Sequence, residues 1–255
     1  MRIAAIYDLH ANTVALEAVL RDIHKENIEM LVVGGDVVSG PNPSETLRIL
    51  CNISIPVRFI LGNAESDILN HLAGKEFNGL SPRANEEAIW VASVLSDDEK
   101  KFLSSWGFSY SVESDIFGKI LFCHGTPRSN QEIFTKQTSD EELKSIFKDV
   151  SASLVVCGHT HMQFDIMTGD IRVVNAGSLG MPFGFTGADW ILIDEAIEFK
   201  HTDYNLESAA ETIRNSNYPH AQTFSENHVL NVPSEDIMLN TLTKSGDNQR
   251  ENKLV

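Results

Sequence analysis

Positive charge is scarce in this sequence. Its 255 residues include 20 Lys and Arg against 36 Asp and Glu, which gives a formal net charge of −16. Proteins that bind nucleic acid non-specifically use Lys and Arg to replace the counterions of the phosphate backbone. We therefore expect no such binding. A small phosphate ester stays open as a substrate, because bound metal ions can reverse the local field.

Cysteine is also scarce, and long apolar runs are missing. The three cysteines, Cys51, Cys123 and Cys157, are odd in number, and two lie inside apolar segments. They are typical of small buried side chains in a reducing cytoplasm. No apolar run is long enough to span a bilayer, so no membrane partner is expected. The first apolar segment runs directly into Asp8 and His10, unlike a signal peptide. We therefore expect a cytoplasmic protein.

Length and composition favour one large α/β domain with a small appendage. The chain is 42% hydrophobic, which is enough to build an ample core. From residue 215 onward it becomes polar. We predict a main domain over residues 1–204, a helical extension packed on it over 205–244, and a disordered tail over 245–255.

Short apolar runs alternate with helical patterns along the main domain. The expected strands cover residues 2–7, 30–33, 57–61, 108–112, 119–123, 154–157, 164–167, 172–174, 189–193 and 197–202. The expected helices cover residues 45–50, 66–73, 83–95, 97–104, 140–148, 206–214 and 234–243, with a further one that Asn12 caps.

Two histidines follow the apolar run of residues 154–157. That run is short and β-branched, which predicts a buried strand, and Gly158 then allows a turn. Residues that alternate along an extended chain point to the same side, so we expect His159 and His161 to converge on one point. Imidazole is a common metal ligand. The alternative is a surface turn with two solvated histidines.

Similar polar side chains follow four other strands. Asp8 and His10 follow the first strand, Asp36 the second, Asn63 the third, and His124 the strand over residues 119–123. Each has an ordinary alternative, because aspartates are common in turns and a lone histidine is usually structural. Strand ends are where open α/β sheets bind ligands.

Together these side chains form a donor set of nitrogen and oxygen without thiolate. Such a set favours Mn or Fe, and Zn or Ni would also fit. Seven donors exceed the needs of one ion but suit two divalent ions that share a bridging carboxylate. A pair of metal ions about 3.5–4 Å apart is the known arrangement for hydrolysing phosphate esters.

In this order the segments resemble the motifs of the calcineurin-like metallophosphoesterases. The resemblance extends from the N-terminus to about residue 193, and the small bacterial phosphodiesterase-type branch looks most similar, with a loop like Gly40-Pro41-Asn42-Pro43. The matching motifs are Asp8-Leu9-His10, Gly35-Asp36, Gly62-Asn63, Cys123-His124-Gly125 and Gly158-His159-Thr160-His161.

The resemblance implies a four-layer αββα sandwich, in which two mixed sheets pack face to face between helices. It implies that one metal ion is held by Asp8, His10 and His161 and the other by Asn63, His124 and His159. Asp36 would bridge the two ions. A hydroxide that bridges the metals would attack phosphorus, so Asp36, Asn63 and His124 would take part in catalysis.

The chain departs from the family at Ala64. Many members have a histidine directly after Gly-Asn that assists the leaving group or orients phosphate. General acid assistance is typically worth about 10²–10⁴-fold, so its loss favours esters with good leaving groups. Asn12 and Arg128 are the nearest polar candidates for phosphate contact. An ordinary capping or surface role is the alternative for both.

The function that the sequence favours is a dinuclear phosphodiesterase for small, nucleotide-type phosphodiesters. One alternative is a phosphomonoesterase or protein serine/threonine phosphatase. Another is a non-catalytic scaffold of the same fold, as the related subunit of the retromer coat is thought to be. The natural substrate and the oligomeric state, including a homo-oligomer, stay open, because they depend on surfaces that a sequence does not show.

Overall fold

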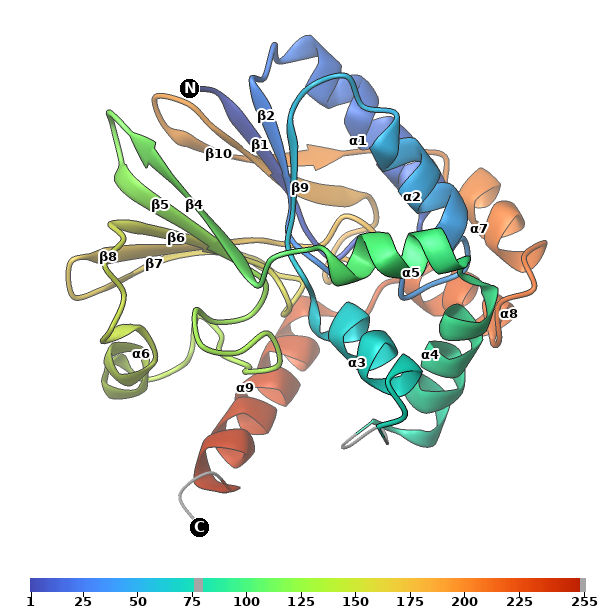
Figure 1. The fold of residues 1–255 in the computed structure, drawn as a ribbon. Helices are drawn as coiled ribbons and strands as arrows, with labels where there is room; N and C mark the ends of the chain where they lie inside the picture. The colour runs from blue at the N-terminus through green and yellow to red at the C-terminus, as the bar shows by residue number, and fades with distance from the viewer. Residues whose placement is uncertain (76–79, 253–255) are drawn as a thin grey trace.

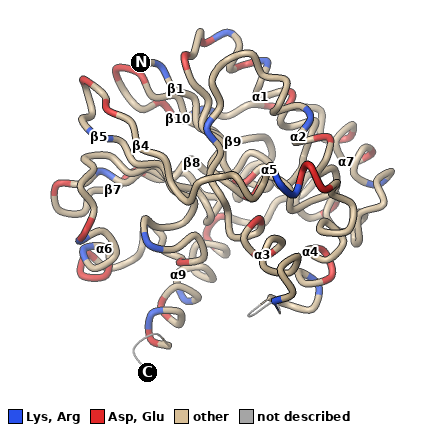
Figure 2. The backbone as a smooth tube through the Cα atoms, in the orientation of Figure 1, with Lys and Arg blue, Asp and Glu red and all other residues tan. Residues whose placement is uncertain are grey.

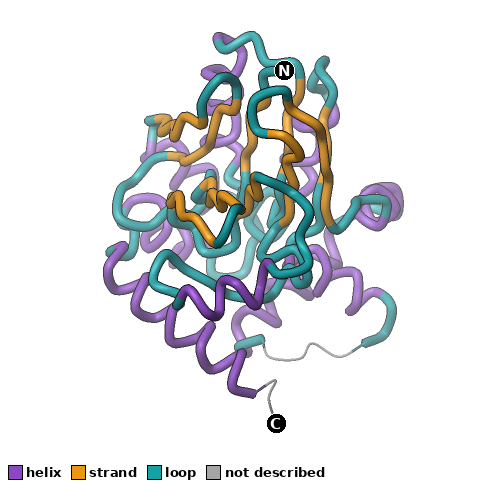
Figure 3. Tube along the Cα trace, turned by 90° about the vertical axis from the view of Figure 1, so that its left-hand side faces the viewer, coloured by secondary structure: helices purple, strands orange, loops and turns teal. Residues whose placement is uncertain are grey.

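Two β-sheets lie face to face with helices on both outer sides. The structure is a computed structural model that describes residues 1–75 and 80–252. Figure 1 shows the two sheets at the centre, with α1 and α2 outside one of them and α6 outside the other. A view turned by 90° shows helices on both sides of the strands (Figure 3). This is the predicted four-layer αββα sandwich.

The first sheet has the order β10-β9-β1-β2-β3. β1 pairs in parallel with β2 and antiparallel with β9. β2 also pairs in parallel with β3, which is an edge strand of this sheet. Its strands are β1 (Ile3–Ile6), β2 (Met30–Val33), β3 (Val57–Phe59), β9 (Ala188–Ile193) and β10 (Ile197–Thr202).

The second sheet has the order β4-β5-β6-β8-β7. Here β5, β6 and β8 are parallel neighbours, and β4 and β7 pair antiparallel at the edges. Its strands are β4 (Ser109–Ser114), β5 (Gly118–Cys123), β6 (Leu154–Cys157), β7 (Gln163–Thr168) and β8 (Ile171–Ala176).

The side chains of β1 show how one strand serves two cores. Ile3, Ala5 and the following Tyr7 join the apolar cluster between the two sheets. Ala4 and Ile6 point the other way, into the cluster beneath the helices. Because successive side chains of a strand face opposite sides, a strand buried on both faces is apolar throughout.

The helices lie mainly on the outer faces. α1 begins where Asn12 accepts a hydrogen bond from the Ala15 amide, as predicted. The helices are α1 (Thr13–Lys25), α2 (Pro43–Cys51), α3 (Asn63–Leu72), α4 (Pro82–Val94), α5 (Asp97–Ser104), α6 (Asp140–Phe147), α7 (Leu206–Arg214), α8 (Ala221–Ser225), the π-helix η1 (Glu226–Leu230) and α9 (Glu235–Asn252).

The C-terminal segment differs from the prediction. Residues 245–252 continue α9, so the prediction of a disordered tail is wrong there, and residues 253–255 lie outside the described part. Arg250 donates hydrogen bonds to the Ile133 carbonyl and the Glu142 carboxylate, at 2.8 Å each. Gly246 is buried, because the chain near Ile133 approaches its Cα closely. The polar helix is ordered by these contacts, which a composition argument does not reveal.

Charged residues lie mostly on the outer helices and loops, with both signs interspersed (Figure 2). Among the described residues, no helix is both long enough and apolar enough to cross a membrane. All three cysteines are free, and Cys123 and Cys157 are buried as predicted, whereas Cys51 is exposed.

Candidate metal centre

The loops that follow β1, β2, β5 and β6 meet at one edge of the sandwich. The amide of Asp8 donates to the Gly35 carbonyl at 3.0 Å, and the amide of Gly158 donates to the His124 carbonyl at 2.8 Å. Two groups of side chains place their ligand atoms within 4.8 Å of one another. They are Asp8, His10 and His161, and Asp8, Asp36 and His124.

His10 and His161 face each other through nitrogens that carry lone pairs. Nδ1 of His10 is 3.1 Å from the Ser39 carbonyl, and Nδ1 of His161 is 2.9 Å from the Met181 carbonyl. A carbonyl only accepts, so an Nδ1 atom that bonds to it carries the proton. With this tautomer in both rings the two Nε2 atoms carry lone pairs, and they lie 3.1 Å apart. A cation bound by both nitrogens would make this close approach favourable.

His124 repeats this pattern in a fully buried position. Its Nδ1 donates to the Gly34 carbonyl at 2.9 Å. Its Nε2 therefore carries a lone pair, and it lies 2.9 Å from the Asn63 Oδ1 and 3.5 Å from the Asp36 Oδ1. Three electron-rich atoms gathered in this way are suited to hold a cation.

His159 and Asp8 each leave a buried polar atom without a partner. A ring nitrogen of His159 bonds to the backbone of Gln131, while its Nε2 is buried and unpaired. The Oδ1 of Asp8 is also buried and unpaired, and its Oδ2 accepts from the His159 amide at 2.8 Å. Buried polar atoms without partners are costly, and bound metal ions would satisfy both.

The backbone that presents these side chains is strained. A positive φ is found at five of the seven predicted ligands: Asp8 (53°), His10 (46°), Asp36 (50°), His159 (70°) and His161 (57°). Such left-handed residues other than glycine cluster at functional sites. The expectation that His159 and His161 alternate along an extended chain is therefore wrong. They are brought to the site by a left-handed turn.

The pKa values of the buried side chains at the site are shifted. Burial, together with Glu65 and Asp8, raises the pKa of Asp36 to about 7, against the lowering effect of His124. Burial and neighbouring imidazoles lower the pKa of His10 and His159 to about 3. Both rings are therefore neutral near pH 7, which is the form that binds metal.

Glu65 supports the site and was missed by the sequence analysis. It is fully buried, and its two oxygens accept four backbone N–H groups. The donors are the amides of Asp36 (2.8 Å), Val37 (2.7 Å), Val38 (3.0 Å) and Gly62 (3.0 Å). It thus fixes the loop that carries Asp36 against the start of α3. Two asparagines also bond to loop carbonyls: Asn130 to Gly62 (2.9 Å) and Asn175 to Gly158 (2.6 Å).

The glycine-rich turn over residues 175–182 holds the loop after β1. The amide of Gly180 and the hydroxyl of Ser178 both donate to the Asp8 carbonyl, at 3.0 and 2.8 Å. In the structure its backbone holds the loop after β1, and Met181 of the same turn lies beside His161 and borders the cavity.

Gly180→Ala is expected to destabilise the protein by about 2 kcal/mol. A Cβ at this position would lie 1.9 Å from the Leu9 carbonyl oxygen, where no flexible side chain can give way. Gly107→Ala is the matched control, because its nearest neighbour, the Ser109 carbonyl oxygen, is 3.3 Å away. Denaturant unfolding of both variants measures the difference. Equal midpoints would contradict the close packing of this turn.

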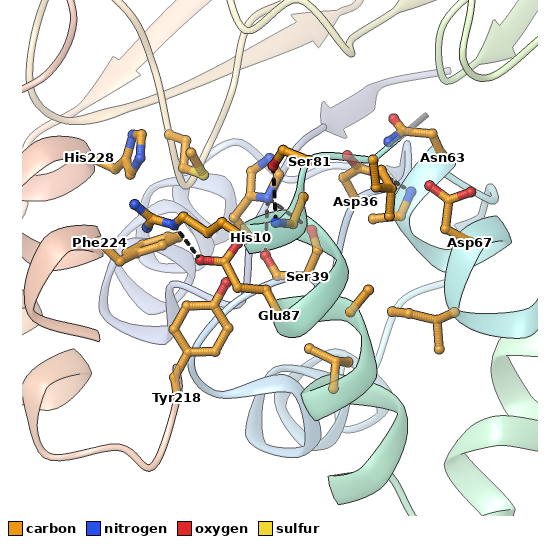
Figure 4. A pocket seen from close by; sticks show the side chains of 18 residues that line it. His10, Asp36, Ser39, Asn63, Asp67, Ser81, Glu87, Tyr218, Phe224 and His228 are labelled. Carbon is orange, nitrogen blue, oxygen red and sulfur yellow. Dashed lines mark hydrogen bonds and ion pairs between the residues drawn. The ribbon is translucent and has the colours of Figure 1, made fainter. Parts of the chain in front are cut away.

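A cavity of about 350 Å³ opens beside the candidate ligands. His10, Asp36 and Asn63 border it, and Figure 4 shows Asp36 between the other two. The remaining wall comes from α3, α4, the C-terminal helices and several loops. It is formed by Ser39, Ala64, Asp67, Ile68, Leu80, Ser81, Arg83, Ala84, Glu87, Ala88, Val91, Met181, Tyr218, Phe224 and His228.

The structure does not support Asn12 and Arg128 as phosphate contacts. The Asn12 amide caps α1 and donates to the Tyr204 hydroxyl at 3.2 Å. Arg128 forms a bidentate pair with the buried Glu132, at 2.8 and 2.7 Å. Neither residue borders the cavity among the described residues. Both side chains are thus used within the fold, which was the alternative considered for each.

Comparisons with known proteins agree with this geometry. Residues 1–195 match the model of the calcineurin-like phosphoesterase superfamily domain. An uncharacterized protein, MJ0912, of Methanocaldococcus jannaschii is 27% identical over 238 residues, which are 85% of this chain and 93% of that protein.

Two crystal structures share the fold. A hypothetical protein, PH1004, of Pyrococcus horikoshii OT3 has a TM-score of 0.78 at 17% identity, covering 91% of this chain and 99% of that chain. A metallophosphoesterase from Sphaerobacter thermophilus has a TM-score of 0.72 at 22% identity, covering 90% of this chain and 99% of that chain. Since the family model spans more than half of the sequence, this chain belongs to the calcineurin-like phosphoesterase superfamily.

Proposed function

We propose that the protein is a phosphodiesterase that uses two divalent metal ions, with Mn or Fe favoured. Membership of the family supports a metal-dependent hydrolase of phosphate esters. The observation that carries the proposal is the set of imidazole Nε2 atoms that lie close to one another and to carboxylate oxygens. The Nε2 atoms of His10 and His161, 3.1 Å apart, are the clearest instance.

We divide the residues between two neighbouring ion positions, with Asp8 and Asp36 placed where the two positions meet. His10 and His161 border one position and His124 the other, with Asp8 within reach of both. We assign Asn63 and His159 to the second position and Asp36 to the bridge. When bound, the ions would supply Lewis-acid stabilisation of phosphoryl charge and acidify an attacking water.

Hydrogen bonds from the surrounding backbone orient the candidate metal ligands. Carbonyl groups of Ser39, Gly34 and Met181 fix the imidazole tautomers, which keeps the lone pairs aimed inward. The Ala64 amide donates to Asp36 Oδ1 at 2.9 Å and thereby sets the orientation of that carboxylate. Because Ala64 has no polar side chain, leaving-group assistance from this position is missing.

A diester fits the cavity better than a monoester. The cavity wall carries the carboxylate of Asp67, which opposes the second negative charge of a monoester, whereas the carboxylate of Glu87 is paired with Arg83. Apolar side chains such as Ile68 and Val91 leave room for a second ester substituent. We therefore propose small, nucleotide-type diesters as substrates, and neither nucleic acid nor a membrane as partner.

Metal-loaded protein is expected to cleave bis(p-nitrophenyl) phosphate and to hydrolyse p-nitrophenyl phosphate more slowly. Elemental analysis should give about two metal equivalents per chain. A chelator should remove the activity, and added Mn²⁺ should restore it. A scaffold would hold well under two equivalents and show no turnover, and a monoesterase would reverse the preference between the two substrates.

A further inference from the structure

A π-helix carries a histidine to the cavity from outside the metal loops. η1 (Glu226–Leu230) follows α8 directly, and His228 lies in its middle. Short π-helical segments are rare and frequently lie at functional sites. Val229 and Phe224 are buried and anchor this segment, and the His228 ring lies 5.3 Å from the Phe224 ring.

His228 has a polar atom with nothing to bind. Its Nδ1 is buried and has no hydrogen-bond partner among the described residues. The residue borders the same cavity as His10 and Asp36. Figure 4 shows His228 and Asn63 at opposite ends of the site, with His10 and Asp36 between them. An unpaired nitrogen on the wall of a cavity is available to a ligand.

Arg83 borders the cavity close to His228. It lies in the first turn of α4, and its Nε donates to Glu87 Oε1 at 2.9 Å. That bond uses one of five N–H groups, so the guanidinium retains further donors. Burial, together with the nearby His161 and Arg83, lowers the pKa of His228 to about 4, so its ring is neutral near pH 7.

Apart from Arg83 and His228, the cavity wall offers neutral side-chain donors, among them Ser39, Asn63, Ser81 and Tyr218. Ser39 Oγ lies 2.9 Å from Nδ1 of His10, and Ser81 Oγ accepts from the Ala84 amide as the cap of α4. Ala64 leaves empty the position where many family members have a histidine. An anionic ester beside this acidic wall needs donors, and His228 and Arg83 are placed to provide them.

We propose that His228 donates a hydrogen bond to an oxygen of the bound phosphate ester, with Arg83 beside it as the positive charge. The C-terminal helices thus complete the substrate site opposite the metal loops. This inference rests on the proposed function. It assigns the substrate contact to residues outside the sequence motifs, one of them beyond the stretch that matches the family model.

His228→Ala is expected to lower kcat/KM for bis(p-nitrophenyl) phosphate by about 10- to 100-fold, the usual effect of losing a hydrogen bond to a charged acceptor. His228→Gln keeps a donor and should restore much of this loss. Asn227→Ala is the matched control, because Asn227 is exposed in the same π-helix. Arg83→Met should raise KM, and Arg83→Lys should retain part of the binding.

Binding of inorganic phosphate separates this inference from the proposed function. Calorimetry on folded, metal-loaded protein should show weaker phosphate binding for His228→Ala and unchanged binding for Asn227→Ala. If the wild type hydrolyses the diester and His228→Ala matches it in both kcat/KM and phosphate affinity, the inference is wrong. If the wild type shows no turnover but His228→Ala weakens phosphate binding, the contact stands and the proposed function fails.

Discussion

Replacing His124 by alanine is expected to abolish measurable hydrolysis. The loss of kcat/KM should reach about 10³-fold or more, which corresponds to about 4 kcal/mol of transition-state stabilisation. His124 is fully buried, and its Nε2 lies within 4 Å of Asn63, Asp36 and Asp8 oxygens. No neighbouring side chain can replace this nitrogen. Asp36→Asn should have a similar effect, because an amide carries no charge to bridge two cations.

The measurements are steady-state kinetics and metal content on the same preparations. His24→Ala is the matched control, because His24 is exposed on α1, away from the cavity-lining residues. The control should keep both metal ions and full turnover, whereas His124→Ala should lose metal. Full turnover in His124→Ala, or in Asp36→Asn, would show that these side chains do not form the reaction centre.

Much of the fold was predictable because its buried strands are short apolar runs with clear ends in the sequence. β2 and β6 begin and end at the residues predicted, and Met30–Val33 and Leu154–Cys157 are buried on both faces. Polar residues directly after such strands lie at the ends of their sheets, and the face-to-face packing of the two sheets brings Asp36 and His124 together. Their position at strand ends was therefore predictable from the strand pattern, whereas their convergence from two sheets was implied by the family resemblance.

The local backbone of the site was not predictable in the same way. Left-handed conformations at His159 and His161 are unfavourable locally and persist because the surrounding contacts impose them. Glu65 was missed for a related reason. Three of its four hydrogen bonds reach across 27 to 29 residues, and nothing in its neighbourhood along the chain marks a buried carboxylate.

The C-terminal wall of the cavity was the least predictable part. Residues 221–230 have no regular apolar period, yet they form α8 and η1 around the buried Phe224 and Val229. Their order depends on a separate apolar cluster that includes Ala209, Ile213 and Tyr218. The site thus combines ligands that the motifs reveal with a wall that only tertiary packing defines.

Glu65→Gln is expected to lower the free energy of unfolding by about 3 kcal/mol. Glu65 Oε1 accepts from Val37 and Val38, and Oε2 accepts from Asp36 and Gly62. An amide preserves the shape but has one oxygen, so it can keep only one of these two pairs. Its NH₂ group would then face two backbone N–H donors in a buried place, which costs more than losing the bonds alone.

Denaturant unfolding monitored by circular dichroism tests this expectation, with Glu17→Gln as the control because Glu17 is exposed on α1. The control should unfold at the wild-type midpoint. Glu65→Gln should also lose diester turnover under conditions where it is fully folded, because the loop that presents Asp36 would no longer be held against α3. A variant that unfolds and turns over like the wild type would show that the loop is positioned by other contacts. Loss of stability with normal turnover would show that Glu65 stabilises the fold without setting the geometry of Asp36.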